Sequence, residues 1–302
     1  MTPRGRAVGG ALVCLAVLAV CLCILRQLAA SGVVGELDLS LSDGALFYAL
    51  LVAIQLLSLS LWRLYAAGHG IRRSFVEALV DSGLLALGKY LPGKIWGLMA
   101  RGTIGEDGVK VETRRVLVSV SEQLTLAVTG ILLFLVLIAA SRWSMSVAAT
   151  VSTGTSALVA AGIALALVRR RFDRAGTGGV STRSSLGGCL LLTGGYGVLW
   201  LVSTLPIVVL VHQSGHIGLG SMSALMTAFL GAMLAGWLAL FAPGGIGVRE
   251  SVFVLLAPPF LSWEEGLFWI TAHRGLSLIF DLVYGLICLA FVAQRSRPAV
   301  TT

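Results

Sequence analysis

Long apolar runs alternate with short polar connections along almost the whole chain. A helix needs about 20 mainly apolar residues to cross roughly 30 Å of hydrocarbon. Runs of this kind occupy residues 8–28, 44–64, 116–140, 144–168, 186–211, 222–242 and 266–292. The pattern predicts an all-α fold, a polytopic transmembrane helix bundle of 7–8 spans that forms one integral membrane domain over residues 1–302.

The apolar segment 74–101 differs from these runs because helix breakers and cations interrupt it. The interruptions are Gly88, Lys89, Pro92, Gly93 and Lys94. Basic residues flank the segment on both sides, which indicates that it enters and leaves the membrane at the same face. We therefore expect a re-entrant hairpin.

A second broken segment covers residues 243–261. It opens with Pro243, Gly244 and Gly245 and closes with Pro258 and Pro259, which leaves too few apolar residues for a straight span. We expect it to cross as a tilted or partly unwound eighth span, because an even number of crossings brings both chain ends to one side. The alternative is a re-entrant segment, which leaves the carboxyl end outside.

The charges between the runs predict the orientation. Arg4 and Arg6 precede the first run, acidic residues follow it, and arginines cluster again near residues 63–73 and 169–183. Positive residues remain on the cytoplasmic side, so we expect a multi-pass protein of the cell (cytoplasmic) membrane with a cytoplasmic amino terminus. The first run also resembles a signal peptide, but its length and Arg26 favour a retained anchor over a cleaved leader.

Composition supports a membrane protein and excludes several other classes. Hydrophobic residues make up 57% of the chain and charged residues only 12%, whereas soluble proteins carry about 25%. The net charge of +8 lies in short loops, so membrane lipids rather than nucleic acid are the expected partners. The five cysteines lack metal-ligand spacing, and no catalytic motif is present. We expect no metal, no cofactor and no self-contained enzyme.

The first candidate site is the stretch KYLPGKIWG at residues 89–97. Pro92 ends one half-helix and Gly93 turns the chain, so the freed amides of the next half-helix point to where a phosphate would bind. Lys89, Lys94 and Arg101 supply cations. The alternative is a set of interfacial anchors, in which Tyr90 and Trp96 belong to the aromatic belt.

The second candidate site is PGGIGVRE at residues 243–250. Glycines such as Gly244 and Gly245 at a helix start allow close backbone approach to a ligand. Arg249 beside Glu250 suits an ion pair or a phosphate clamp. The alternative is a tight loop with solvated charges.

Ionisable residues inside long runs form the third candidate set: Glu122, His273, Arg274 and Asp281. A charge at the membrane centre costs roughly 2.5–3.5 kcal/mol, so each needs a partner or a wet cavity. Arg274 and Asp281 share a helix face two turns apart, and Glu122 is an available partner for Arg274. The alternative is a structural ion pair, with His273 a packed, neutral, hydrogen-bonded side chain.

Taken in order, KYLPGKIWG with Arg101, then Glu122, then PGGIGVRE, then HRG at 273–275, the chain resembles the lysylphosphatidylglycerol synthase transmembrane family. This is the membrane part of the multiple peptide resistance factor proteins, and the resemblance covers nearly the whole chain. It implies re-entrant segments and a role in handling or moving anionic lipids or lipid-linked glycan precursors. The matching positions are Lys89, Pro92, Gly93, Lys94, Arg101, Glu122, Gly244, Gly245, Arg249, Glu250 and Arg274.

Two departures limit what the resemblance implies. Many members carry an acidic residue after the first Pro-Gly turn, where this chain has Trp96 and Gly97. The chain ends at Thr302 without the soluble aminoacyl-transferase domain, so lysyl transfer is not expected.

The sequence therefore favours a flippase for an anionic lipid or a polyprenyl-phosphate-linked precursor. The headgroup is expected at the broken helices, with Glu122, Glu250 and Asp281 as charge partners of the cations. One alternative is a non-transporting accessory subunit for a cell-envelope biosynthesis enzyme that acts on glycans or lipids. Another is an intramembrane lipid transferase.

Overall fold

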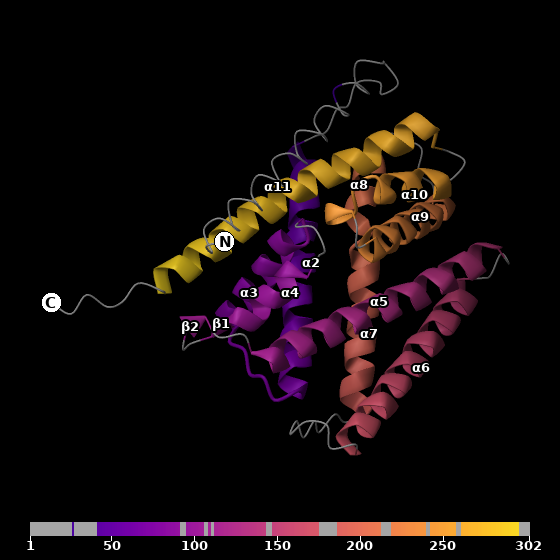
Figure 1. The fold of residues 1–302 in the computed structure, drawn as a ribbon. Coiled ribbons are helices and arrows are strands. Elements are labelled where there is room, and N and C mark those ends of the chain that lie inside the picture. The colour runs from indigo at the N-terminus through magenta and orange to yellow at the C-terminus, as the bar shows by residue number, and fades with distance from the viewer. Residues whose placement is uncertain are drawn as a thin grey trace.

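The computed structural model describes Arg26 and residues 41–90, 95–105, 108–109, 112–142, 147–174, 186–212, 219–239, 242–257 and 261–295. These residues are almost entirely helical (Figure 1). The helices are α2 (Leu41–Gly68), α3 (Phe75–Gly88), α4 (Trp96–Thr103), α5 (Thr113–Arg142), α6 (Val147–Arg174), α7 (Leu186–Val202), α8 (Leu205–His212), α9 (Leu219–Leu238), η1 (Pro243–Gly245), α10 (Val248–Leu256) and α11 (Trp263–Arg295). A short antiparallel pair, β1 (Ile104–Gly105) with β2 (Gly108–Val109), follows α4.

Five helical stretches among the described residues are long and apolar enough to cross a membrane. They are Ser42–Gly68, Thr113–Ser141, Leu186–His212, Ser221–Leu238 and Trp263–Phe291. The chain is thus a helical membrane protein, as the apolar runs predict. Apart from Arg26, the predicted run 8–28 lies outside the described residues, and the apolar part of α6 is shorter, Ser152–Leu167. The total of 7–8 spans and the side on which each end lies stay predictions.

The first interrupted segment forms a pair of short helices, α3 and α4. A Cβ on Gly88 would collide with the backbone of Gly97, so the two helices meet with no room for a side chain at this point. Glycine at both positions permits this close approach. Residues 91–94, which contain the Pro-Gly turn, lie outside the described residues.

The α3 helix begins with a capping box. The Glu77 carboxylate accepts a 2.8 Å hydrogen bond from the Ser74 amide, and the Ser74 hydroxyl accepts one from the Glu77 amide. Burial by itself would raise the pKa of Glu77, but the Ser74 hydrogen bonds and the nearby charge of Arg73 together outweigh burial and lower this pKa below 4.5.

The second interrupted segment is a break between α9 and α10. Gly244, Gly245 and Gly247 take positive φ values of 60°, 74° and 80°, which side chains strongly disfavour. A Cβ on Gly245 would lie 2.7 Å from the carbonyl oxygen of Gly236, so the chain folds back closely along α9. Nine residues give α10 a length of about 14 Å, which is too short to cross the hydrocarbon by itself. How the segment 243–261 crosses stays a prediction.

Both interrupted segments pack along α11 (Figure 1). The α3 helix covers the C-terminal half of α11, where a Cβ on Gly83 would collide with Cys288, and α10 contacts the N-terminal half near Gly266. Because both helices run antiparallel to α11, the C-terminal end of α3 meets the start of the η1–α10 segment near the middle of α11. On the other side, α5 contacts both α4 and α9.

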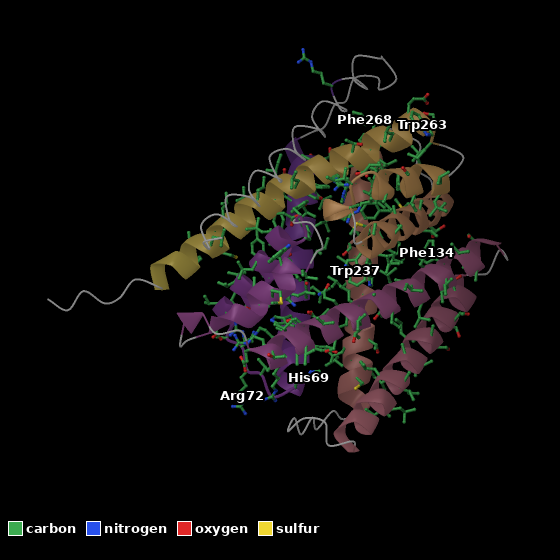
Figure 2. All side chains as sticks on the ribbon, in the orientation of Figure 1. His69, Arg72, Phe134, Trp237, Trp263 and Phe268 are labelled. Carbon is green, nitrogen blue, oxygen red and sulfur yellow. The ribbon has the colours of Figure 1, made fainter. Side chains whose placement is uncertain are left out.

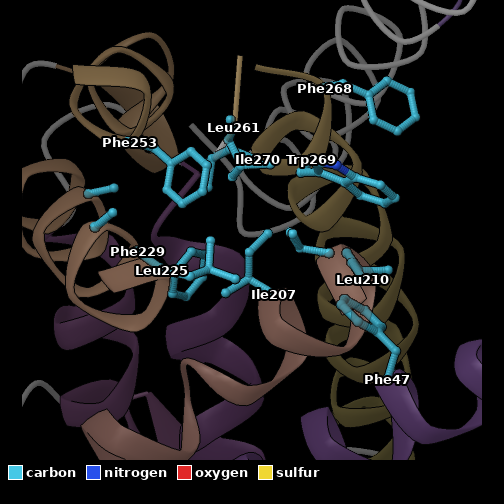
Figure 3. Close-up of a cluster of buried hydrophobic side chains, with 13 residues drawn as sticks. Phe47, Ile207, Leu210, Leu225, Phe229, Phe253, Leu261, Phe268, Trp269 and Ile270 are labelled. Carbon is cyan, nitrogen blue, oxygen red and sulfur yellow. The ribbon is translucent and has the colours of Figure 1, made fainter. Parts of the chain in front are cut away.

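A buried apolar cluster fixes α2, α8, α9, α10 and α11 relative to one another (Figure 3). Its members include the aromatic residues Phe47, Phe229, Phe253, Phe268 and Trp269 and the aliphatic residues Ile207 and Leu210. His69 and Arg72 lie at one end of the molecule, away from this cluster, and Trp263 at the start of α11 lies at the other (Figure 2). The loop arginines and the acidic start of α11 are therefore at opposite ends, in agreement with the charge pattern of the sequence.

Candidate functional site

The two broken segments meet through their backbones. The amide of Gly244 donates a 2.9 Å hydrogen bond to the carbonyl oxygen of Lys89. A Cβ on Gly244 would lie 2.9 Å from the Tyr90 ring and 3.1 Å from Nη2 of Arg274. Only glycine therefore fits at position 244, for its positive φ and for the surrounding side chains. The sequence hypothesis expected both stretches to serve one headgroup, which requires them to meet, and the fold brings Lys89 and Gly244 into contact.

Arg274 connects α11 to the second break. Its Nη2 donates a 3.0 Å hydrogen bond to the Gly244 carbonyl oxygen, and its Nη1 pairs with Glu250. The other oxygen of Glu250 accepts a 2.8 Å hydrogen bond from the Gly247 amide at the start of α10. Arg274 is only 3% exposed. This arginine thus holds the unwound backbone and the α10 start against α11.

Lys89 and Tyr90 bind Asp281 of α11 from the other break. The Lys89 Nζ and the Tyr90 hydroxyl each lie 2.6 Å from the same Asp281 oxygen, Oδ2. The Lys89 side chain is 45% exposed, whereas Tyr90 is only 4% exposed. Tyr90 is therefore a buried hydrogen-bond donor, and the interpretation of this residue as an interfacial anchor is wrong.

Arg249 is the cation of this junction that has no carboxylate partner among the described residues. Glu250 is paired with Arg274, and Asp281 with Lys89. The Arg249 Nε is buried without a hydrogen-bond partner in the described part of the chain, although the side chain as a whole is half-buried. The side chain lies within electrostatic range of Arg274, which repels it, and of Glu250 and Asp281, which attract it. The described junction thus contains three cationic side chains and two carboxylates, which leaves one positive charge unbalanced.

Arg101 and Glu122 form a separate buried pair. Arg101 Nη1 lies 2.6 Å from the Glu122 carboxylate, and the guanidinium stacks 4.3 Å from the Trp62 ring. Tyr196 donates a 3.1 Å hydrogen bond to the other Glu122 oxygen. Arg101 is 1% exposed and Glu122 3%. The expected pairing of Glu122 with Arg274 is wrong, because the packing of α4 against α5 brings Arg101 to Glu122 instead.

A further ion pair next to Arg101 was not among the candidate residues. Arg73 Nη2 lies 2.7 Å from Oδ1 of fully buried Asp81, and Trp62 donates a 3.1 Å hydrogen bond to the other Asp81 oxygen. Arg101 Nε also donates to the Asp81 carbonyl oxygen at 3.3 Å. An aspartate in an apolar run signals a buried partner, but a tyrosine such as Tyr196 in an apolar helix carries no comparable signal.

Pro92, Gly93, Lys94 and His273 are the remaining predicted residues. Pro92, Gly93 and Lys94 lie outside the described residues. His273 packs between the rings of Phe47 and Phe229, with centroid separations of 5.5 and 4.7 Å. Packing of His273 is confirmed, but neither of its ring nitrogens has a hydrogen-bond partner among the described residues.

These features define a helical membrane protein in which two interrupted helical segments meet against one long helix, with cations at the junction. Comparison of the chain with family models, with curated proteins and with solved structures finds no match in any of the three. The geometry of the junction is therefore the main basis for a functional proposal.

Proposed function

We propose that the junction of α3 with η1–α10 binds the anionic headgroup of a lipid or of a polyprenyl-phosphate-linked precursor, and that the protein moves this lipid across the membrane. The observation that carries the proposal is a half-buried cation, Arg249, whose charge no carboxylate balances among the described residues and which lies beside unwound backbone. Broken helices at membrane depth are typical of transporter binding sites, because freed backbone groups need protein, water or a ligand as partners. Burying a cation at membrane depth costs free energy, so a cation found there is a candidate functional residue.

Three groups supply the affinity in this proposal. The first amides of α10 have no acceptor within the helix, and the helix dipole favours an anion near them. Lys89 offers an exposed ammonium next to the break. Arg249 offers a guanidinium, whose geometry suits two phosphate oxygens. The acyl or prenyl chains stay in the surrounding lipid, where Ile246 and Leu255 already expose apolar surface.

The cellular setting is part of the proposal. We place the protein in the cytoplasmic membrane, with the arginine-rich end around Arg72 inside and the acidic start of α11 outside. The resemblance of KYLPGKIWG and PGGIGVRE to the lysylphosphatidylglycerol synthase transmembrane family supports the same function, because that family is associated with anionic lipids.

Reconstitution tests the proposal. Purified protein in phosphatidylcholine vesicles with a trace of fluorescent phosphatidylglycerol should make inner-leaflet label accessible to a membrane-impermeant quencher. Arg249→Ala and Arg274→Ala should each slow this movement, whereas Arg72→Ala, a loop substitution at one end of the molecule, should not. Movement no faster than in empty vesicles, or unchanged movement in both junction variants, would contradict the proposal.

A further inference from the structure

Not every cation at the junction has a carboxylate partner, and the number without one limits the charge of the ligand that the site can balance. Two of the three cations already have an anionic partner, Arg274 with Glu250 and Lys89 with Asp281. Arg249 has none among the described residues, and its Nε is buried without a hydrogen bond there. Arg249 as a whole is half-buried, so its guanidinium loses part of its hydration without an ion pair in return, which lowers the stability of the folded protein.

The surroundings of Arg249 keep its guanidinium near the break. A Cβ on Gly236 would lie 3.0 Å from Arg249 Nε, so the side chain passes directly over this glycine of α9. Arg274 is not available to bind the ligand's negative charge, because it is 97% buried and bonded to both Glu250 and Gly244. Arg249 is therefore the described cation of the junction whose charge no carboxylate already balances.

Resting on the function proposed above, we propose that Arg249 receives the ligand's negative charge and that the site selects a lipid phosphodiester, which carries one such charge. A doubly charged phosphomonoester or a diphosphate would need a second unbalanced cation, whereas the other described cations of the junction, Lys89 and Arg274, are each balanced by a carboxylate. A zwitterionic headgroup would bring its own ammonium toward a site that already has excess positive charge. A phosphodiester balances the junction and presents two free oxygens to the guanidinium.

Equilibrium binding to delipidated protein in detergent tests the assignment. Native mass spectrometry would compare short-chain phosphatidylglycerol, phosphatidylcholine and phosphatidic acid at pH 8, where a phosphomonoester carries about two negative charges. Phosphatidylglycerol should bind most tightly. Arg249→Gln should weaken phosphatidylglycerol binding about 10- to 100-fold, the range for a charged hydrogen-bonded contact, and Arg249→Lys should restore part of it. Arg72→Gln is the matched neutralisation in an exposed loop and should change nothing.

A stability measurement separates lost binding from lost folding. Because Arg249→Gln leaves no carboxylate without its partner, the lipid-free variant should melt at the wild-type temperature or above it. The rise in melting temperature that phosphatidylglycerol gives the wild type should disappear in this variant. Arg274→Gln should instead melt lower, because Glu250 loses its cation.

The outcomes distinguish this inference from the function on which it rests. If phosphatidic acid binds at least as tightly as phosphatidylglycerol, or if Arg249→Gln binds phosphatidylglycerol as the wild type does, the phosphodiester assignment is wrong while an anionic-lipid site remains. If neither anionic lipid binds more tightly than phosphatidylcholine, the proposed function fails as well.

Discussion

The buried pair of Arg101 and Glu122 allows a quantitative test of whether these charges are structural. We consider Arg101→Leu, Glu122→Leu and the double substitution. The two side chains are 1% and 3% exposed and lie 2.6 Å apart, so each is the other's main compensation for lost hydration. Each single substitution leaves one charge buried and alone, whereas the double substitution leaves none.

The expected magnitudes follow from this difference. Removing one partner of a buried ion pair costs about 3–5 kcal/mol. The double variant loses the Arg101 stacking on Trp62 and the Tyr196 hydrogen bond, each worth about 1 kcal/mol, but it also loses the cost of burying two ions. We therefore expect the double variant to be destabilised by about 2 kcal/mol or less, which is less than either single variant.

The assay is a double-mutant cycle on the free energy of unfolding in mixed micelles, with phosphatidylglycerol movement measured in parallel. The refolded double variant should move phosphatidylglycerol at about the wild-type rate, because Arg101 lies outside the junction. Interhelical hydrogen bonds in a membrane protein couple by only about 0.6 kcal/mol on average. A coupling energy no larger than that would refute the assignment of a strong buried ion pair. Loss of transport in a stable double variant would instead return Arg101 to the binding site.

Three further predictions concern the junction and its support. Gly245→Ala should lower the free energy of unfolding by about 1–3 kcal/mol, because alanine is strained at a φ of 74° and its Cβ meets the α9 backbone. Gly44→Ala is the control and should not destabilise the protein, because Gly44 has open space around it. Equal melting temperatures for the two variants would contradict this prediction. Tyr90→Phe should cost about 1.5–3 kcal/mol in chemical unfolding, since Asp281 loses a 2.6 Å hydrogen bond, and an unchanged midpoint would count against that contact. Because the folded-state pKa of Glu77 is lowered from its ordinary value, its stabilisation is fully present above that ordinary value and is lost as the pH falls through the lower folded-state pKa. The difference in melting temperature between wild type and Glu77→Gln should shrink from pH 6 to pH 3, and a constant difference would disprove the capping contribution.

Much of the architecture can be predicted from the sequence, because whether a segment enters the membrane depends mainly on its own residues. A run of about 20 apolar residues is stable in hydrocarbon whatever its neighbours are, so the spans at 44–64, 116–140 and 266–292 match α2, α5 and α11 closely. Breakers act locally too. Gly244 and Gly245 marked the break before α10 because few other residues adopt positive φ.

The pairing of charges could not be predicted from the sequence, and the expected pairing of Glu122 with Arg274 was wrong. An intramembrane Glu122 indicates that some cation must lie nearby, but several arginines meet that requirement equally well. The choice of Arg101 follows from how α4 packs against α5. In the same way, nothing local in the stretch around Lys89 indicates that its carbonyl oxygen accepts the amide of Gly244.

The sequence by itself therefore determined which segments enter the membrane, where the helices break and which residues carry buried charge, because each of these depends on transfer energies and backbone preferences of neighbouring residues. Only the tertiary structure decided that the two breaks meet against α11 and that Arg249 is left without a carboxylate among the described residues. Those results depend on close contacts between helices, such as Gly245 against Gly236, whose partners lie on different elements of the fold.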